Sequence, residues 1–127
     1  MNKKLYLIQQ KINYLQAGLL RFHDKDELVT LEVKTTANDD ASLNCIIMDS
    51  SLSGYTMADK TVNLIQKIKD DYLYITGRVQ GETGERKKIL FIKILKASWF
   101  VRKRKAGISW LKEKYVYETL NEEYIIK

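Results

Sequence analysis

Residues 72–80 read YLYITGRVQ and residues 89–95 read ILFIKIL, and these two stretches decide the fold class. In the first stretch, Leu73, Ile75 and Val79 lie at odd positions, which is the period of a strand with one buried face. The second stretch is apolar almost throughout, as expected for a central strand. Glycines between the two stretches favour a tight turn. The sequence therefore predicts an antiparallel hairpin.

Two further strands are predicted earlier in the chain. Residues Leu28–Thr36 alternate apolar and polar side chains, and in residues Leu43–Met48 the side chains of Leu43, Cys45 and Ile47 alternate with those of Asn44, Ile46 and Met48. The polar run Asn38–Asp40 favours a turn between them, so they form a second hairpin, with Cys45 as a small core residue. Residues Thr61–Ile68 fit a helix and a strand equally well.

A helix is predicted at the start of the chain. Apolar residues recur at steps of three and four from Leu5 to Phe22, which indicates one apolar stripe along a helix. We expect this helix within residues 1–19, because Gly18 is a residue typical of a helix end.

A second helix is predicted at the other end, over residues 108–123. Ser109 is a candidate N-cap, and aromatic and apolar residues recur on one stripe from Trp110 onward. The basic run at residues 102–107 is expected to be the loop that precedes this helix.

The length and the order of these elements complete the fold prediction. A chain of 127 residues is expected to form one domain over residues 1–127. Short strands at this spacing, between two terminal helices, indicate a small antiparallel β-barrel of about six strands, in the mainly β or α+β class.

Charge and cysteine content restrict the partners and the compartment. The net charge is +6, and residues 86–112 hold ten basic residues and no acidic one, so a polyanionic partner is expected to meet the protein there. Cys45 is the only cysteine, which excludes an internal disulfide and fits a reducing compartment. Because no apolar run approaches the length of a signal peptide or a membrane span, we expect a cytoplasmic protein without membrane insertion.

Catalytic chemistry has little support in the sequence. His23 is the only histidine, and no serine has the flanking glycines of a nucleophile elbow. A metal site built from several histidines is excluded by that count, and no phosphate-binding glycine loop is present. The acidic pairs at residues 39–40 and 70–71 are expected to be turn residues. We therefore predict a protein that is not an enzyme and that has no metal or cofactor.

The distinctive motif follows the predicted strand Leu43–Met48. The chain continues as Asp49-Ser-Ser51-Leu-Ser-Gly54, which is Asp-x-Ser-x-x-Gly. A carboxylate at a strand end can accept hydrogen bonds from a guanine edge, a nearby hydroxyl can bond the ligand, and glycine permits close approach of the backbone. This pattern resembles the second signature of the PilZ family, bacterial β-barrel receptors for cyclic di-GMP.

Other residues carry the resemblance over about residues 20–120. The family's later strand ends in Gly-Arg-Val, and here residues 77–79 read GRV. The family's first signature is Arg-x-x-x-Arg, and the matching stretch is Arg21-Phe-His-Asp-Lys25, so lysine stands where the second arginine belongs. Lysine keeps the charge but lacks the bidentate guanidinium fork.

The resemblance implies a receptor that binds cyclic di-GMP and signals to a protein effector partner, with ligand binding weakened or lost because of Lys25. The implied ligand-binding residues are Arg21, Lys25, Asp49, Ser51 and Gly54. Additional phosphate contacts are expected from the basic run if the fold brings it close: Arg102, Lys103, Arg104 and Lys105.

Two alternatives remain open at the level of sequence. One is an OB-type barrel that binds single-stranded nucleic acid, with Tyr72, Tyr74 and Arg78 on one strand face and with Trp99 and Phe100 beside the basic run. The other is a protein-interaction module without a ligand, which docks through its aromatic C-terminal helix.

Overall fold

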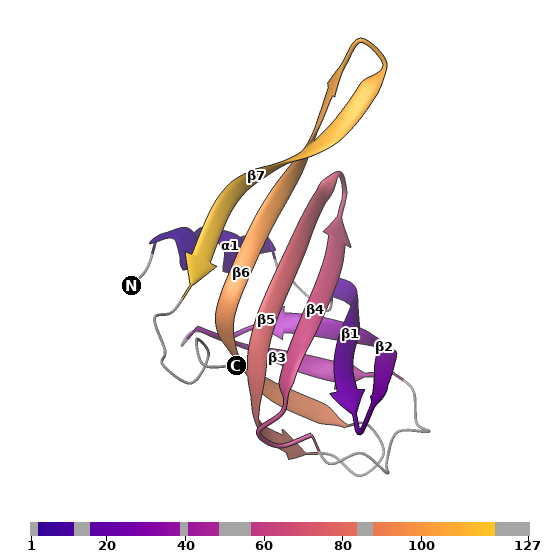
Figure 1. The fold of residues 1–127 in the computed structure, drawn as a ribbon. Coiled ribbons are helices and arrows are strands. Elements are labelled where there is room, and N and C mark those ends of the chain that lie inside the picture. The colour runs from indigo at the N-terminus through magenta and orange to yellow at the C-terminus, as the bar shows by residue number, and fades with distance from the viewer. Residues whose placement is uncertain (1–2, 12–15, 39–40, 49–56, 84–87, 119–127) are drawn as a thin grey trace.

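The computed structural model describes residues 3–11, 16–38, 41–48, 57–83 and 88–118. One short helix, α1 (Lys3–Lys11), precedes the strands of this part of the chain (Figure 1). The strands are β1 (Gln16–Asp24), β2 (Glu27–Ala37), β3 (Ser42–Ile47), β4 (Thr61–Ile68), β5 (Asp71–Thr83), β6 (Ile89–Lys105) and β7 (Ile108–Glu118).

The strands pair antiparallel in the order β3-β2-β1-β4-β5-β6-β7, and β3 also pairs with β6. That last pairing closes β1 to β6 into a ring of six strands, which confirms the predicted small antiparallel β-barrel architecture. Both predicted hairpins are confirmed, as β2 with β3 and as β5 with β6. The ambiguous segment Thr61–Ile68 is strand β4, because it finds β1 on one side and β5 on the other.

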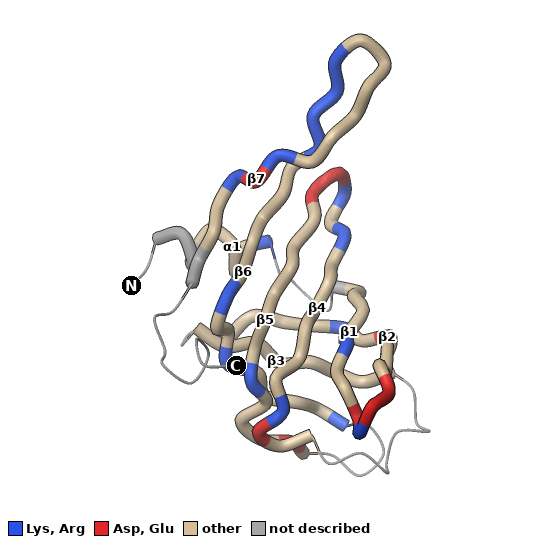
Figure 2. The backbone as a smooth tube through the Cα atoms, in the orientation of Figure 1, with Lys and Arg blue, Asp and Glu red and all other residues tan. Residues whose placement is uncertain are grey.

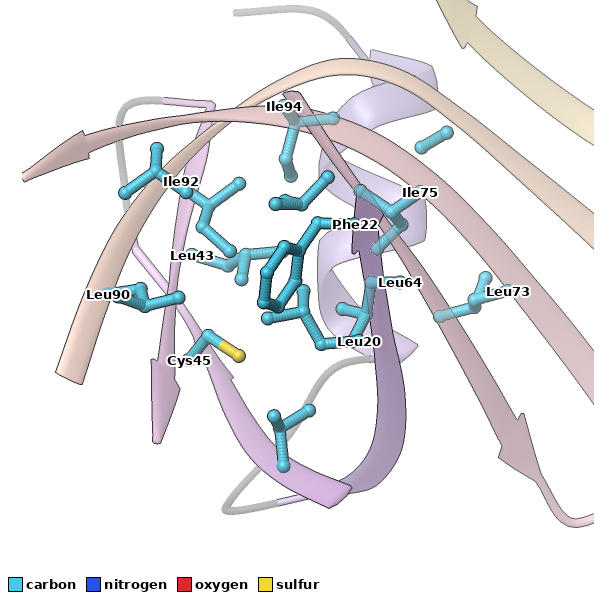
Figure 3. Close-up of a cluster of buried hydrophobic side chains, with 14 of the residues drawn as sticks. Leu20, Phe22, Leu43, Cys45, Leu64, Leu73, Ile75, Leu90, Ile92 and Ile94 are labelled. Atoms are coloured by element: carbon cyan, nitrogen blue, oxygen red, sulfur yellow. The ribbon is translucent and has the colours of Figure 1, made fainter. Parts of the chain in front are cut away.

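The interior of the ring is filled by apolar side chains from every one of its strands (Figure 3). Phe22, Leu64 and Ile75 point into this core, and Ile8 of α1 is also fully buried in it. Burial of each such side chain contributes about 1.5–3 kcal/mol to folding, so the core is the main source of stability.

The predicted N-terminal helix over residues 1–19 is confirmed at Lys3–Lys11 and is wrong from Gln16 onward. Residues Gln16–Asp24 form β1, and Leu19, which the helical stripe placed in the core, is 38% exposed, whereas Leu20 is 0% exposed. Leu20 and Phe22 are spaced by two, which is a strand period. Pairing with β2 on one side and β4 on the other outweighs the helical spacing, because tertiary pairing routinely overrides local preference.

The predicted C-terminal helix over residues 108–123 is also wrong where the structure describes it. Residues Ile108–Glu118 form β7, which pairs along the second half of β6. Ser109 does not cap a helix, since its hydroxyl accepts a hydrogen bond from Arg102 Nη1 at 3.0 Å. The predicted basic loop is the end of β6, and only Ala106 and Gly107 form the turn. Both have positive φ, 52° and 78°, as a two-residue hairpin turn of type I′ requires.

Gly77 marks the point where the β5–β6 pair bends to close the ring. The register shifts there, and Leu95 of β6 is left without a partner on β5. A Cβ on Gly77 would lie 2.7 Å from the carbonyl oxygen of Lys93, and it would also overlap the side chain of Ile92. The glycine of the Gly-Arg-Val stretch is therefore a close-packing residue.

Within the part of the chain that the structure describes, no helix has the length and apolar character needed to cross a membrane.

We predict that Gly77→Ala lowers the free energy of unfolding by about 2 kcal/mol, because the new methyl group overpacks the bend. Gly81→Ala is the matched control, since its Cβ would meet only Phe91 at 3.8 Å and its effect should stay within about 0.5 kcal/mol. Urea denaturation of both variants measures the difference. Equal stabilities would contradict the packing role of Gly77.

The buried thiol of Cys45 provides a second prediction. Burial raises its pKa from 9.0 to about 12, so the reactive thiolate is scarce in the folded protein at pH 8. A disulfide reagent should leave the native thiol unlabelled and should label it rapidly in denaturant. Above pH 9 the unfolded state gains stability by ionising this thiol, so the free energy of unfolding falls as the pH rises from 9 towards 12.

Candidate ligand-binding site

Among the predicted site residues that the structure describes, Arg21 lies on the outer surface of the ring. Leu20 and Phe22 point inward on β1, so Leu19 and Arg21, which alternate with them along the strand, face outward. Arg21 pairs with Thr30 of β2 and Asn63 of β4. Asp49, Ser51 and Gly54 lie outside the described residues, and the described part of the chain stops at Met48, just before them.

A groove runs along this outer surface around Leu19, which lies two residues before Arg21 on the same face of β1, and we call it the outer groove. It has a volume of about 670 Å³, and the side chains that form it include Leu19, Lys34, Met48, Ile65, Lys67 and Tyr72. This volume lies within the range of small-molecule sites. Three of these residues are aliphatic or thioether side chains and two are lysines, and Glu32 also lines the groove, so an apolar surface is combined with two positive charges and one negative charge.

Backbone pairing explains how distant residues meet at the groove. Leu19 of β1 lies opposite Ile65 of β4, and Ile65 lies opposite Tyr74 of β5. On the other side of β1, Leu19 lies opposite Glu32 of β2, and the Glu32 carbonyl oxygen accepts a hydrogen bond from the Met48 backbone N–H at 3.2 Å. The strand end that leads into Asp49 is therefore held at the groove.

Arg21 is short of hydrogen-bond acceptors. Its Nε is buried and has no hydrogen-bond partner among the residues that the structure describes. Buried polar groups are normally paired, because an unpaired donor loses its hydration without compensation. An anionic ligand beside β1 would supply the missing acceptor.

Lys25 is not among the residues that line the groove. It is the first residue of the two-residue turn between β1 and β2, where Asp24 lies opposite Glu27, and its φ is +57°. Four residues of extended strand place it about 13 Å along the chain from Arg21. Lys69 occupies the same position in the turn between β4 and β5, also with φ +57°. The structure thus gives Lys25 a turn role that the sequence pattern did not indicate.

The basic run meets the groove only at its first residue. Arg102, Lys103, Arg104 and Lys105 lie at the far end of β6, in a hairpin that projects from one end of the molecule, whereas the β1–β2 turn lies at the other end (Figure 1). Arg102 donates a hydrogen bond to the hydroxyl of Tyr72, which lines the groove, at 3.1 Å. The fold therefore does not bring these four cations near Lys25.

Sequence reasoning missed the two lysines of the groove. Lys34 lies on the polar face of a correctly predicted strand, so its outward direction was available from the alternation. Lys67 lies in the segment whose helical or strand character was ambiguous, and its place beside Tyr72 follows from the β4–β5 pairing. The Lys67 ammonium lies 5.9 Å from the centre of the Tyr72 ring.

The larger hollow of about 840 Å³ beside α1 is a less suitable ligand site. Its polar groups already satisfy one another: Asp71 accepts a hydrogen bond from Trp99 Nε1 at 2.9 Å and forms an ion pair with Lys11 at 3.3 Å. The same lysine lies 4.5 Å from the centre of the Trp99 ring. These contacts tie α1 to β5 and β6.

Of the aromatic residues that the OB-type alternative would use to stack on bases, only some are exposed to solvent. Trp99 is buried in the core, whereas Tyr74 is exposed and packs edge-on against Phe100 with 5.4 Å between ring centres. An OB barrel has five strands, and the ring here has six. The helix expected to carry the protein-interaction alternative is strand β7 over Ile108–Glu118.

No three His, Cys, Asp or Glu side chains gather into a candidate metal site among the residues that the structure describes. His23 lies exposed at the end of β1, where its carbonyl oxygen accepts a hydrogen bond from Lys60 Nζ at 3.5 Å.

Comparison with known proteins adds information on the fold. No family model matches the chain, and no curated protein matches its sequence. Among solved structures, the chain is similar to general stress protein 26 from Jannaschia sp. CCS1, with 8% identity, a TM-score of 0.54, and coverage of 90% of this chain and 100% of that one. It is also similar to the Bacillus subtilis inhibitor of motility (MotI/DgrA), with 15% identity and a TM-score of 0.48. That match covers 83% of this chain and 60% of the inhibitor. The first likeness supports the β-rich fold.

We predict that Lys25→Asn raises the free energy of unfolding by up to about 1 kcal/mol, because asparagine tolerates a left-handed backbone better than lysine does. Asp26→Asn, at the next turn residue, is the control and should have little effect, since positive φ is recorded for Lys25 and not for Asp26. Thermal unfolding of both variants tests this. A loss of stability in Lys25→Asn would show that the lysine has a contact role.

Proposed function

We propose that this protein is a non-enzymatic receptor for a cyclic dinucleotide of the cyclic di-GMP type, bound in the outer groove and signalling to a protein partner. The observation that carries the proposal is the meeting of two sequence features at one surface. Arg21 shares the outer face of β1 with Leu19, which lines the groove, and Met48, which immediately precedes the Asp-x-Ser-x-x-Gly motif, also lines it.

The chemistry of the groove suits such a ligand. Leu19, Ile65 and Met48 offer an apolar surface for the faces of the bases, and Tyr72 offers an aromatic ring. Lys34 and Lys67 offer charges for the two phosphates, in addition to the guanidinium of Arg21. The motif residues Asp49 and Ser51 would then read a guanine edge from the loop that follows Met48.

Lys25 has no part in this form of the proposal. Arg21 is the member of the first PilZ-like signature that shares the face of β1 with groove-lining Leu19, and the second cation comes from Lys34 or Lys67. A lysine binds phosphate as a point charge without a bidentate fork, so we expect weaker binding than a two-arginine clamp would provide.

Isothermal calorimetry with cyclic di-GMP tests the proposal. We expect binding at micromolar concentrations or tighter, and a loss of about tenfold or more in Arg21→Ala, Lys67→Ala and Asp49→Ala, because each removes a charge-assisted contact. The charge-matched control for the two cationic variants is Lys96→Ala, which lies three strands from Arg21 along the same row of paired residues.

Two results would overturn the proposal. One is the absence of heat at high protein concentration in the wild-type protein. The other is an equal loss of affinity in Lys96→Ala and Lys67→Ala, which would indicate diffuse attraction by net charge rather than a site in the groove.

A further inference from the structure

The end of the β6–β7 hairpin projects beyond the rest of the sheet (Figure 1). The last β5–β6 pair is Asp71 with Val101, so the following residues of β6 pair only with β7. We call residues 102–111 the arm. Its four β6 residues extend about 13 Å past the end of β5.

The two strands of the arm carry different side chains: the residues of β6 are cationic, and most residues of β7 are apolar and exposed. Figure 2 shows Lys and Arg along all of its β6 strand, and the opposite strand carries no charge. Each cation lies opposite a residue of β7: Arg102 with Leu111, Lys103 with Trp110, Arg104 with Ser109 and Lys105 with Ile108. The apolar partners are exposed to solvent, with Ile108 at 67%, Trp110 at 44% and Leu111 at 40%.

Both faces of the arm carry cations. Directly paired residues share a face and successive residues alternate, so Arg102 and Arg104 lie on one face and Lys103 and Lys105 on the other. Arg102 anchors the base of the arm, because it donates hydrogen bonds to Tyr72 Oη at 3.1 Å and to Ser109 Oγ at 3.0 Å. The other three have no hydrogen bond or ion pair with the described residues.

This distribution favours a partner that surrounds the arm. A membrane surface selects a helix or ribbon with one apolar face and one charged face, whereas here cations and apolar side chains occur on both. The major groove of DNA is about 12 Å wide, admits a two-stranded β-ribbon and has phosphates along both walls. The deep, narrow major groove of duplex RNA does not admit side chains.

We propose that the arm is a binding element for double-stranded DNA that enters a groove of the duplex. The cations contact phosphates on both walls, and Trp110 and Ile108 pack against sugar and base edges. Contacts between cations and phosphates carry no sequence information, so the part of the affinity that comes from them is independent of sequence. The arm adjoins the outer groove only through the hydrogen bond of Arg102 to Tyr72, and the inference does not depend on the ligand proposed there.

Fluorescence anisotropy with a labelled duplex of mixed sequence tests the inference on the full chain. Binding should weaken steeply with salt, because each neutralised phosphate releases counterions. The double variant Lys103→Gln/Lys105→Gln should lose about tenfold or more in affinity, and the slope of log K against log salt should fall by about 2. Trp110→Ala should weaken binding and leave that slope unchanged.

The matched control is Lys93→Gln/Lys96→Gln, which removes the same charge from β6 within the ring. It should retain most of the affinity and of the salt slope. Equal losses in the two double variants would overturn the inference in favour of diffuse charge attraction. Tighter binding to single-stranded than to duplex DNA would also overturn it, as would binding to anionic phospholipid vesicles without binding to DNA. Circular dichroism of each variant establishes that the fold is retained.

Discussion

The fold depends on the strand β6, which pairs with β3 along its first half and with β7 along its second half. Its first half pairs with β3, from Ile89 to Lys93, and this contact closes the ring around the core. Its second half, from Lys96 to Lys105, pairs with β7. Between the two halves the β5–β6 register shifts at Gly77, where the absence of a side chain allows the backbones to approach. A strand of 17 residues can serve both purposes only because it bends at this point.

This arrangement places cations on two parts of the fold. The outer groove lies on the side of the ring formed by β1, β2, β4 and β5, and Lys34 and Lys67 are among its lining residues. The arm lies beyond the end of β5 and carries its cations on exposed ribbon (Figure 2). The groove has the size of a small-molecule site, whereas the arm projects from the ring. Arg102 joins the two, because it donates a hydrogen bond to Tyr72, which lines the groove.

Local pattern predicted the strands best where burial on one face made the alternation regular. Leu73, Ile75 and Val79 were placed correctly, and Cys45 is buried in the core as expected. The same reasoning failed at Leu19 and Leu20, because steps of three and four happened to coexist with a spacing of two. It failed again at Ser109, since a hydroxyl before an aromatic stripe fits a helix cap as well as a strand. In both cases the deciding contribution was hydrogen bonding to strands distant in sequence.

For the candidate site, too, some features follow from the sequence and others only from the tertiary structure. Sequence alone determined that the protein is β-rich, that it carries a basic segment at residues 86–112, and that Arg21 and the Asp49 motif resemble a receptor signature. Only the tertiary structure decided that Lys34 and Lys67 line one groove, that Lys25 belongs to a turn, and that the basic segment ends in a projecting hairpin. The physical reason is that charge and alternation are properties of neighbouring residues, whereas neighbours across a closed sheet are set by strand order and register.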